Sequence, residues 1–268
     1  MAAKKQALNS YDPSWYGWKP DLPDHRDLIY KPKKTQKALP KSVDLRPGCP
    51  PVYNQGQLGS CTGNAIAAAI QFGLRKQRKQ YDFMPSRLFI YYNERVIENT
   101  VAIDNGAEIR NGIKSVNKLG VCPETMWPYS DGATKFKKKP GDDCYKEALK
   151  HQVLSYHRIE KKLELMKACL AEGFPFVFGF TVYKEFEGAA ITKTGILDLP
   201  KPNEYIKGGH AVLCVGYDDA TKRFLIRNSW DTDWGIQGYF TMPYAYLTDV
   251  NLSEDFWTIR MVETTAKK

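Results

Sequence analysis

A loop with two glycines leads directly into an alanine-rich run, and a single cysteine, Cys61, stands at the junction. Residues 54–65 read Asn-Gln-Gly-Gln-Leu-Gly-Ser-Cys-Thr-Gly-Asn-Ala, and only alanine and isoleucine follow as far as residue 70. This order predicts a loop and then a helix that begins at the cysteine. Unpaired backbone N–H groups and the positive end of the helix dipole favour a thiolate at such a position. Cys61 is therefore a candidate nucleophile, and the alternative is a small buried cysteine in a core helix.

Three residues elsewhere in the chain could complete a thiol acyl-transfer site. Gln55 could bring its amide beside the Cys61 N–H, so that two donors would bind a developing oxyanion. His210 lies in an apolar, strand-like stretch that is entered through a glycine pair. Asn228 follows on the next apolar stretch and could orient the imidazole, and Trp230 could keep water away from that hydrogen bond. Cysteine, histidine and asparagine are the nucleophile, base and orienting residue of thiol acyl transfer.

These blocks resemble the papain family of cysteine peptidases, of the prokaryotic or viral type with a short N-terminal extension. The matching stretches are 54–56, 59–61, 210–217, 228–230 and 234–239. The resemblance implies an α+β, papain-like fold, with a helical half, a β-barrel-like half and the active-site cleft between them. It also implies a cysteine endopeptidase with a Cys61–His210–Asn228 triad, a thioester acyl-enzyme, and an oxyanion hole formed by Gln55 and the Cys61 N–H. A strongly depressed pKa of Cys61 follows from the same resemblance.

The resemblance also marks candidate substrate-binding residues. Asn105 and Gly106 fall where the family carries an Asn-Gly-Gly substrate loop, and an ordinary turn between helices is the alternative. Gly208 and Gly209 fall where family members line the pocket for the second residue before the scissile bond. Two glycines there indicate a roomy pocket, and we expect it to accept bulky apolar side chains.

Two other functions stay open. A thiol amidase or transferase that acts on cell-wall peptides or isopeptide bonds would use the same cysteine and histidine chemistry. A catalytically silent papain-like module that only binds is the second, although such a copy is expected to have lost a catalytic residue. No cofactor and no metal is expected, because His210 and Cys214 lie four residues apart on a strand, too far apart to hold one zinc ion.

The cysteines and the N-terminal sequence indicate a reducing compartment. The six cysteines show no Cys-x-x-Cys spacing, and Leu58 stands where the family commonly has a further cysteine. A dense disulfide framework is therefore not expected, while a Cys122–Cys144 bridge stays open. The first residues carry no apolar signal segment and no run reaches membrane-spanning length, so a cytoplasmic location fits best.

The net charge of +9 comes partly from basic clusters at 31–41, 75–79 and 135–139. No nucleic-acid recognition motif accompanies them, so solvated surface is the preferred interpretation. We expect a monomer that acts on a peptide or protein substrate, with no nucleic acid and no membrane as partner.

The hydrophobic period changes along the chain, and this change predicts helices followed by strands. We divide the chain into a 1–38 extension, a mainly helical half at 39–150 that carries the nucleophile, and a mainly β half at 151–268 that carries the histidine and asparagine. The expected helices are 61–80, 85–98, 107–119 and 161–171. The expected strands are 174–182, 211–217, 224–228, 239–242 and 257–262.

The extension at 1–38 is rich in aromatic residues and prolines, which disordered tails rarely are. Its aromatic residues are Tyr11, Trp15, Tyr16, Trp18 and Tyr30. Because it precedes the apparent start of a mature domain, we expect it to occupy the cleft of its own enzyme as the inhibitory prosegment of a zymogen. The alternative is an aromatic strap along the back of the domain.

Overall fold

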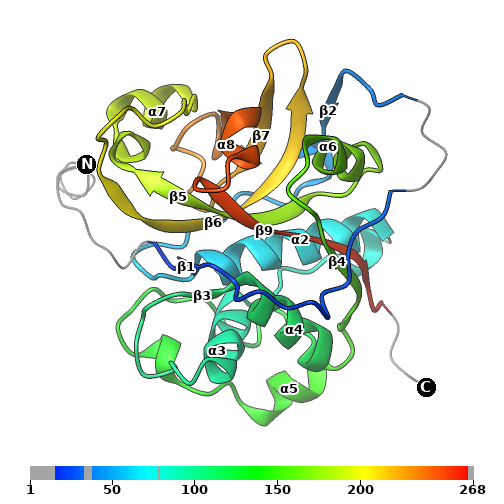
Figure 1. Cartoon of the computed structure of the whole chain (residues 1–268). Helices are drawn as coiled ribbons and strands as arrows, with labels where there is room; N and C mark the ends of the chain where they lie inside the picture. The colour runs from blue at the N-terminus through cyan, green and yellow to red at the C-terminus, as the bar shows by residue number, and fades with distance from the viewer. Residues whose placement is uncertain (1–15, 33–37, 78, 265–268) are drawn as a thin grey trace.

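The structure is a computed structural model that describes residues 16–32, 38–77 and 79–264. The helices that follow α2 in the first half of the chain gather on one side of this longest helix, and the large sheet lies on its other side together with the later helices (Figure 1). The α-helices are α2 (Cys61–Gln77), α3 (Arg87–Ile97), α4 (Ile109–Leu119), α5 (Asp142–Ala148), α6 (Leu163–Ala171), α7 (Ala189–Thr194) and α8 (Tyr244–Thr248). Short 3-10 helices span Arg46–Gly48, Lys79–Tyr81, Lys135–Lys137 and Lys184–Glu187. None of the helices in the described part of the chain is long and apolar enough to cross a membrane.

The main sheet has seven strands in the order β4-β9-β5-β6-β7-β8, and β2 pairs with β6 as well. Its strands are β2 (Ser42–Asp44), β4 (Val153–Arg158), β5 (Phe176–Tyr183), β6 (Ile206–Asp218), β7 (Arg223–Arg227), β8 (Tyr239–Pro243) and β9 (Ser253–Val262). Every pairing within it is antiparallel. Alternation of buried and exposed residues is weak in β5 and β6, because both of their faces are covered.

The expectation of a β-barrel-like half is corrected, since no pairing among the described strands closes the sheet. Each edge strand bonds to an irregular segment where a closed barrel would join the edges. On β4, the Arg158 N–H donates to Leu28 O at 2.7 Å and Arg158 O accepts from the Tyr30 N–H at 2.8 Å. On β8, the Thr241 N–H donates to Gly195 O at 2.7 Å. These backbone groups of the edge strands therefore have hydrogen-bond partners although the sheet does not close into a barrel.

Helix α2 is almost wholly buried, which its small residues make possible. Every residue from Cys61 to Leu74 is buried, and Gly63 brings the helix so close to α3 that a Cβ there would lie 2.8 Å from Arg87 O. The helix ends at Gln77, slightly earlier than expected, and Arg75 and Lys76 in its last turn complement the helix dipole.

Three helices, α3, α4 and α6, start two residues later than expected, and the shifts of α3 and α4 have local causes. Ser86 caps α3 and accepts a hydrogen bond from the Phe89 N–H at 3.2 Å, so Pro85 precedes the helix. Residues 107–108 form strand β3 (Ala107–Glu108), not the first turn of a helix, because they pair in parallel with β1 (Trp18–Lys19). A partner distant in sequence thus overrides the local helical pattern.

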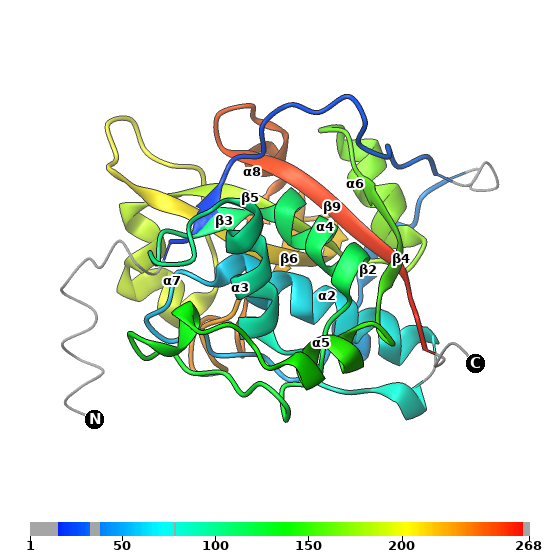
Figure 2. The ribbon, with the colours of Figure 1, turned by 90° about the horizontal axis from the view of Figure 1, so that it is seen from below.

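The described N-terminal segment, residues 16–32, crosses the body on the surface (Figure 2). It begins beside β3, where β1 pairs with it, and then reaches the edge of the main sheet, where Ile29 bridges to Arg158. Tyr11 and Trp15 lie outside the described residues. Helices α2 to α5 fall within residues 61–148 and strands β4 to β9 within 153–262. The division of the chain at residue 150 stays a prediction.

Candidate active site

Cys61 is the first residue of α2, and strand β6 holds its sulfur. The Ala211 N–H donates to Cys61 Sγ at 3.3 Å. The thiol therefore lies against the residue that follows His210, although the two are far apart in the sequence. Cys61 and His210 are both fully buried.

His210 is oriented by Asn228, which directly follows β7. His210 Nε2 and Asn228 Oδ1 are 2.8 Å apart, and the same Oδ1 accepts the Ser229 N–H at 2.9 Å. Because Oδ1 is an acceptor in both contacts, Nε2 carries the proton in the neutral ring. His210 Nδ1 is buried and has no hydrogen-bond partner among the described residues, so it is the nitrogen that could accept a proton.

Aromatic rings surround the imidazole and keep water from the His210–Asn228 hydrogen bond. The ring centroids of His210 and Trp230 are 5.1 Å apart, with the planes inclined by 31°. The rings of Phe180 and Phe186 lie 5.8 and 6.0 Å from that of His210. A dry environment of this kind strengthens the hydrogen bond.

Gln55 is fully buried in the loop before α2, and its side chain is fixed at both ends. Its Oε1 accepts from Ser229 Oγ at 2.6 Å, and its Nε2 donates to Leu58 O at 3.1 Å. Its backbone N–H also donates to Ser229 O, at 2.9 Å. With the oxygen held by Ser229, the amide NH₂ is the end that faces the loop leading to Cys61.

Sequence analysis missed Asp104, which fixes the loop on its other side. The Asp104 carboxylate accepts the Gly59 N–H at 3.1 Å and the Tyr91 hydroxyl at 2.5 Å. The sequence signal was present, because Asp104 precedes the Asn-Gly pair that we singled out as a turn. An aspartate beside a glycine turn is common, however, and its partner in the loop could not be read from the sequence.

Three of the four candidate substrate-binding residues touch the N-terminal segment. A Cβ on Gly106 would overlap Gly17 O, a Cβ on Gly208 would lie 2.7 Å from Tyr16 Cβ, and a Cβ on Gly209 would lie 2.5 Å from Trp18 O. The fourth, Asn105, is exposed.

Gly17 packs against the loop that leads to Cys61, at a position where only a glycine fits. A Cβ there would overlap Gly59 O, and the Gly17 N–H hydrogen-bonds to Cys61 Sγ. Gly17 O accepts the Ala107 N–H at 2.7 Å. The segment therefore covers the sulfur.

The covered site does not show the depressed pKa of Cys61 that the resemblance implies. Burial raises the pKa of Cys61 to about 12, against the N–H groups of Ala211, Gly17 and Thr62, which favour the thiolate. Burial lowers the pKa of His210 to about 4, and the Asn228 hydrogen bond opposes this only in part. A depressed thiol pKa is thus wrong for this covered state, because loss of water outweighs the helix N-terminus.

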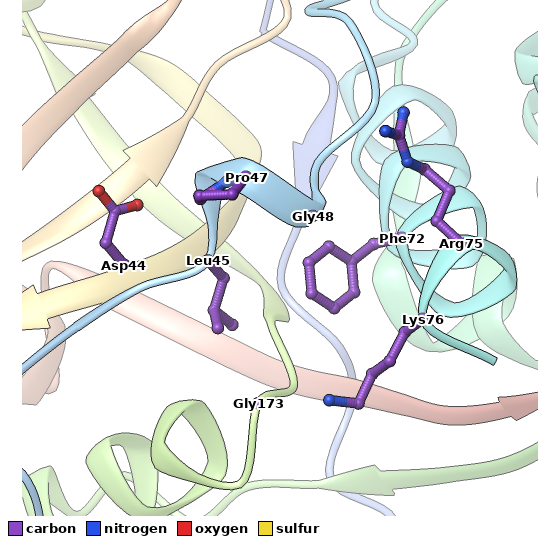
Figure 3. Close-up of a pocket in the computed structure, with 8 residues that line it drawn as sticks. All are labelled: Asp44, Leu45, Pro47, Gly48, Phe72, Arg75, Lys76 and Gly173. Carbon is purple, nitrogen blue, oxygen red and sulfur yellow. The ribbon is translucent and has the colours of Figure 1, made fainter. Parts of the chain in front are cut away.

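Other candidate sites are weaker. All six cysteines are free, so the Cys122–Cys144 bridge is not formed. No group of three or more metal-binding side chains occurs among the described residues. An open pocket of about 350 Å³ is lined by Asp44, Leu45, Pro47, Gly48, Phe72, Arg75, Lys76 and Gly173 (Figure 3). It lies at the far end of α2, about 16–22 Å along the helix axis from Cys61, and it includes no triad residue.

Comparison with known proteins agrees with this geometry. The sequence pattern of the papain family of cysteine proteases matches residues 39–256. The chain belongs to this family. This papain-family protease is 47% identical to xylellain, a cysteine protease from Xylella fastidiosa, and the two structures agree with a TM-score of 0.88 over 96% of this chain and 99% of that one.

Two further relatives place this papain-family protease in a wide group. An uncharacterized peptidase C1-like protein of Acanthamoeba polyphaga mimivirus is 45% identical over 92% of this chain and 87% of its own length. The procathepsin L 3 structure from the larval midgut of Tenebrio molitor shares 18% identity and a TM-score of 0.69, over 93% of this chain and 77% of that one, which shows a common fold. The papain-like α+β fold and the cysteine protease class are thereby confirmed.

Proposed function

We propose that this papain-family cysteine protease is an endopeptidase that uses Cys61, His210 and Asn228 as its triad. The observation that carries the proposal is the His210 Nε2–Asn228 Oδ1 contact of 2.8 Å, on the strand whose next N–H holds Cys61 Sγ. Asn228 fixes the ring, and Nδ1 is then the nitrogen that takes the thiol proton.

The reaction that follows from this assignment has two steps. The Cys61 sulfur attacks the substrate carbonyl carbon as the thiol proton moves to His210 Nδ1. The Gln55 NH₂ and the Cys61 N–H bind the oxyanion, and His210 returns the proton to the leaving amine as a thioester forms. Water then attacks the thioester, with His210 as base, and releases the acid product.

We further propose that the N-terminal segment makes the chain an autoinhibited zymogen. The group of the segment that meets Cys61 Sγ is the Gly17 N–H, while Gly17 O bonds to β3. The Gly17 carbonyl oxygen is engaged by the Ala107 N–H, which supports a segment that docks over Cys61 as an inhibitor. A segment attached to its own enzyme also binds at an effective concentration in the millimolar range, so weak contacts suffice.

Acidic side chains of the segment pair with the body and support this proposal. Asp27 bonds to Arg110 at 2.6 Å and to Arg158 at 3.1 Å. Asp21 accepts the Arg110 N–H at 3.0 Å, and Arg158 also bonds to Asp255 at 2.9 Å. We call these five residues the Asp–Arg cluster. Its carboxylates are nearly inaccessible to solvent, so breaking it leaves buried charge unpaired.

Gly17→Ala in the full chain tests both proposals. Gly17 has no left-handed backbone conformation, so alanine is tolerated in a released segment, but its Cβ blocks docking against Gly59. We expect Cys61 alkylation and cleavage of an unfolded protein to increase at least about tenfold. Leu22→Ala, at a side chain in the segment that is 72% exposed, is the matched control and should change neither rate.

The outcomes separate the alternatives. The endopeptidase is supported if Gly17→Ala releases free peptides from the unfolded protein and if adding Cys61→Ala abolishes this release. Cleavage of cross-links alone would indicate the amidase or transferase. If Gly17→Ala melts at a lower temperature with unchanged kinetics, the segment is only a structural strap.

A further inference from the structure

Trp18, the residue next to Gly17 in the segment, fills a pocket that two glycines make possible. A Cβ on Gly179 of β5 would overlap the Trp18 indole, and a Cβ on Gly209 of β6 would lie 2.7 Å from that ring. Trp18 itself is only 8% exposed. The two neighbouring strands thus leave room for one large flat side chain, next to the position of the residue that covers the nucleophile.

The pocket ends in a carboxylate. Trp18 Nε1 donates to Asp255 Oδ2 at 3.1 Å, and the Asp21 N–H donates to the same oxygen at 2.8 Å. Arg158 occupies the other oxygen, Oδ1, at 2.9 Å. Asp255 is 1% exposed. Both donors to Oδ2 belong to the N-terminal segment, whereas Arg158 belongs to the body of the molecule.

Release of the segment exposes Asp255 Oδ2 to water, and a ligand that fills the pocket buries this acceptor again without its two former donors. A buried carboxylate oxygen that loses its hydrogen bonds is costly, so a ligand that supplies a new N–H donor is favoured over one that does not. Because Arg158 already neutralises Asp255, a cationic side chain in the pocket would meet the guanidinium as well as the carboxylate. The pocket is suited to a neutral donor on a large ring.

We propose that Asp255 is a specificity-determining residue that selects tryptophan in this pocket. The inference rests on the proposed endopeptidase function and gives its substrate class: peptides with tryptophan at the second residue before the scissile bond. That position is what the papain-family resemblance implies for Gly209, which lies against the Trp18 ring and directly precedes His210. The selection depends on the aromatic ring of the substrate residue and on its N–H donor. It therefore applies whether the substrate backbone runs in the same direction as the N-terminal segment or in the opposite direction.

The test compares peptides that differ only at that position, cleaved by the full chain with Gly17→Ala. The residues compared are tryptophan, 2-naphthylalanine, leucine and arginine, and naphthylalanine has nearly the shape of tryptophan without the N–H. We expect kcat/KM for tryptophan to exceed that for naphthylalanine by about 10- to 100-fold, the range for a hydrogen bond to a charged group. Arginine should also fall below tryptophan.

Asp255→Asn in the same background should lower the tryptophan-to-naphthylalanine ratio about fivefold or more, because a neutral acceptor makes a weaker bond. Cleavage of the naphthylalanine peptide should change little. Glu254→Gln is the matched control, since this neighbouring carboxylate is 42% exposed, and it should leave the ratio unchanged. The peptide comparison in Gly17→Ala decides the matter even if Asp255→Asn does not fold.

Three results would overturn the inference while leaving the endopeptidase intact: equal rates for tryptophan and naphthylalanine, a preference for arginine, or an equal loss of selectivity in Glu254→Gln. Failure of Gly17→Ala to cleave any of the four peptides, with Cys61 freely alkylated, would overturn the proposed function and this inference together.

Discussion

At the scale of single residues, the site depends on how a few polar atoms are held. Asn228 Oδ1 accepts from His210 Nε2 and from the Ser229 N–H, so it cannot donate and fixes the ring's tautomer. Ser229 in turn holds the Gln55 amide. One short stretch after β7 thus positions both the proposed base, His210, and the proposed oxyanion donor, Gln55.

Asn228→Asp and Asn228→Ala give a prediction at this scale. Asp keeps an oxygen that accepts from His210 Nε2, whereas Ala removes it. In the Gly17→Ala background we expect Ala to lower kcat about 10- to 1,000-fold, the range seen when an orienting residue is lost, and Asp to lower it less.

The measurement is kcat across a pH series, with the melting temperature of each variant as control. A carboxylate in place of the Asn228 amide stabilises the imidazolium, so the lower limb of the pH profile of Asn228→Asp should shift to higher pH. Equal losses in the two variants with unchanged pH profiles would contradict an orienting role.

At the scale of elements, β1 and β3 pair only because the N-terminal segment lies in place, and the Asp–Arg cluster joins that segment to β4, α4 and β9. Because of this cluster, the stability of the closed state, in which the segment lies over Cys61, depends on pH. In the closed state burial raises the pKa of Asp255 to about 7, and the Asp21 carboxylate adds to this. Burial raises the pKa of Asp21 too.

Release of the segment admits water and separates the two carboxylates, so the pKa of Asp255 falls toward about 4. The closed state then binds the proton more tightly than the open state. The closed state, in which the segment covers Cys61, is therefore most stable at acid pH, and its stability relative to the open state falls as the pH rises from about 4 through 7. Arg110 and Arg158 stay charged throughout this range.

The measurement is the ratio of Cys61 alkylation rates in the wild type and Gly17→Ala, which cancels the ionisation of the thiol itself. We expect this ratio to rise at least about tenfold between pH 5 and pH 8. Asp255→Asn should flatten the rise. A ratio that falls with pH would contradict the linkage.

At the scale of the whole molecule, a segment outside the papain-family match lies over Cys61, the proposed nucleophile, which is fully buried. Asp27 is the residue through which this closure can be tested without touching the cleft, because it bonds to Arg110 and Arg158 with only 4% of its side chain exposed. Asp27→Asn should raise Cys61 alkylation at least about tenfold, since two arginines lose a buried partner.

Asp24→Asn is the control in the same segment. Its partners Arg26 and Lys114 are 77% and 42% exposed, and exposed ion pairs contribute little. Alkylation should therefore stay within about twofold of the wild type. Equal effects of the two substitutions, or none from Asp27→Asn, would show that the cluster does not hold the segment.

The monomeric state and the absence of nucleic-acid partners stay predictions.

The sequence by itself determined the features that local pattern and motif encode. The loop, Cys61 and the alanine-rich helix follow from residues adjacent in the chain, and the change of hydrophobic period predicted helices before strands. The order of Cys61, His210 and Asn228 identified the family, because chemistry constrains those residue types wherever the fold places them.

Tertiary structure alone decided the pairings between distant segments. Trp18 and Asp255 are 237 residues apart, and neither carries a signal that names the other. The β1–β3 pairing and the hydrogen bonds along the β4 edge of the sheet depend on where the N-terminal segment lies. Hydrogen bonding and desolvation act through space. Gly17, 44 residues before Cys61 in the chain, lies against the sulfur, and the burial that raises the pKa of the thiol could not be read from any local pattern.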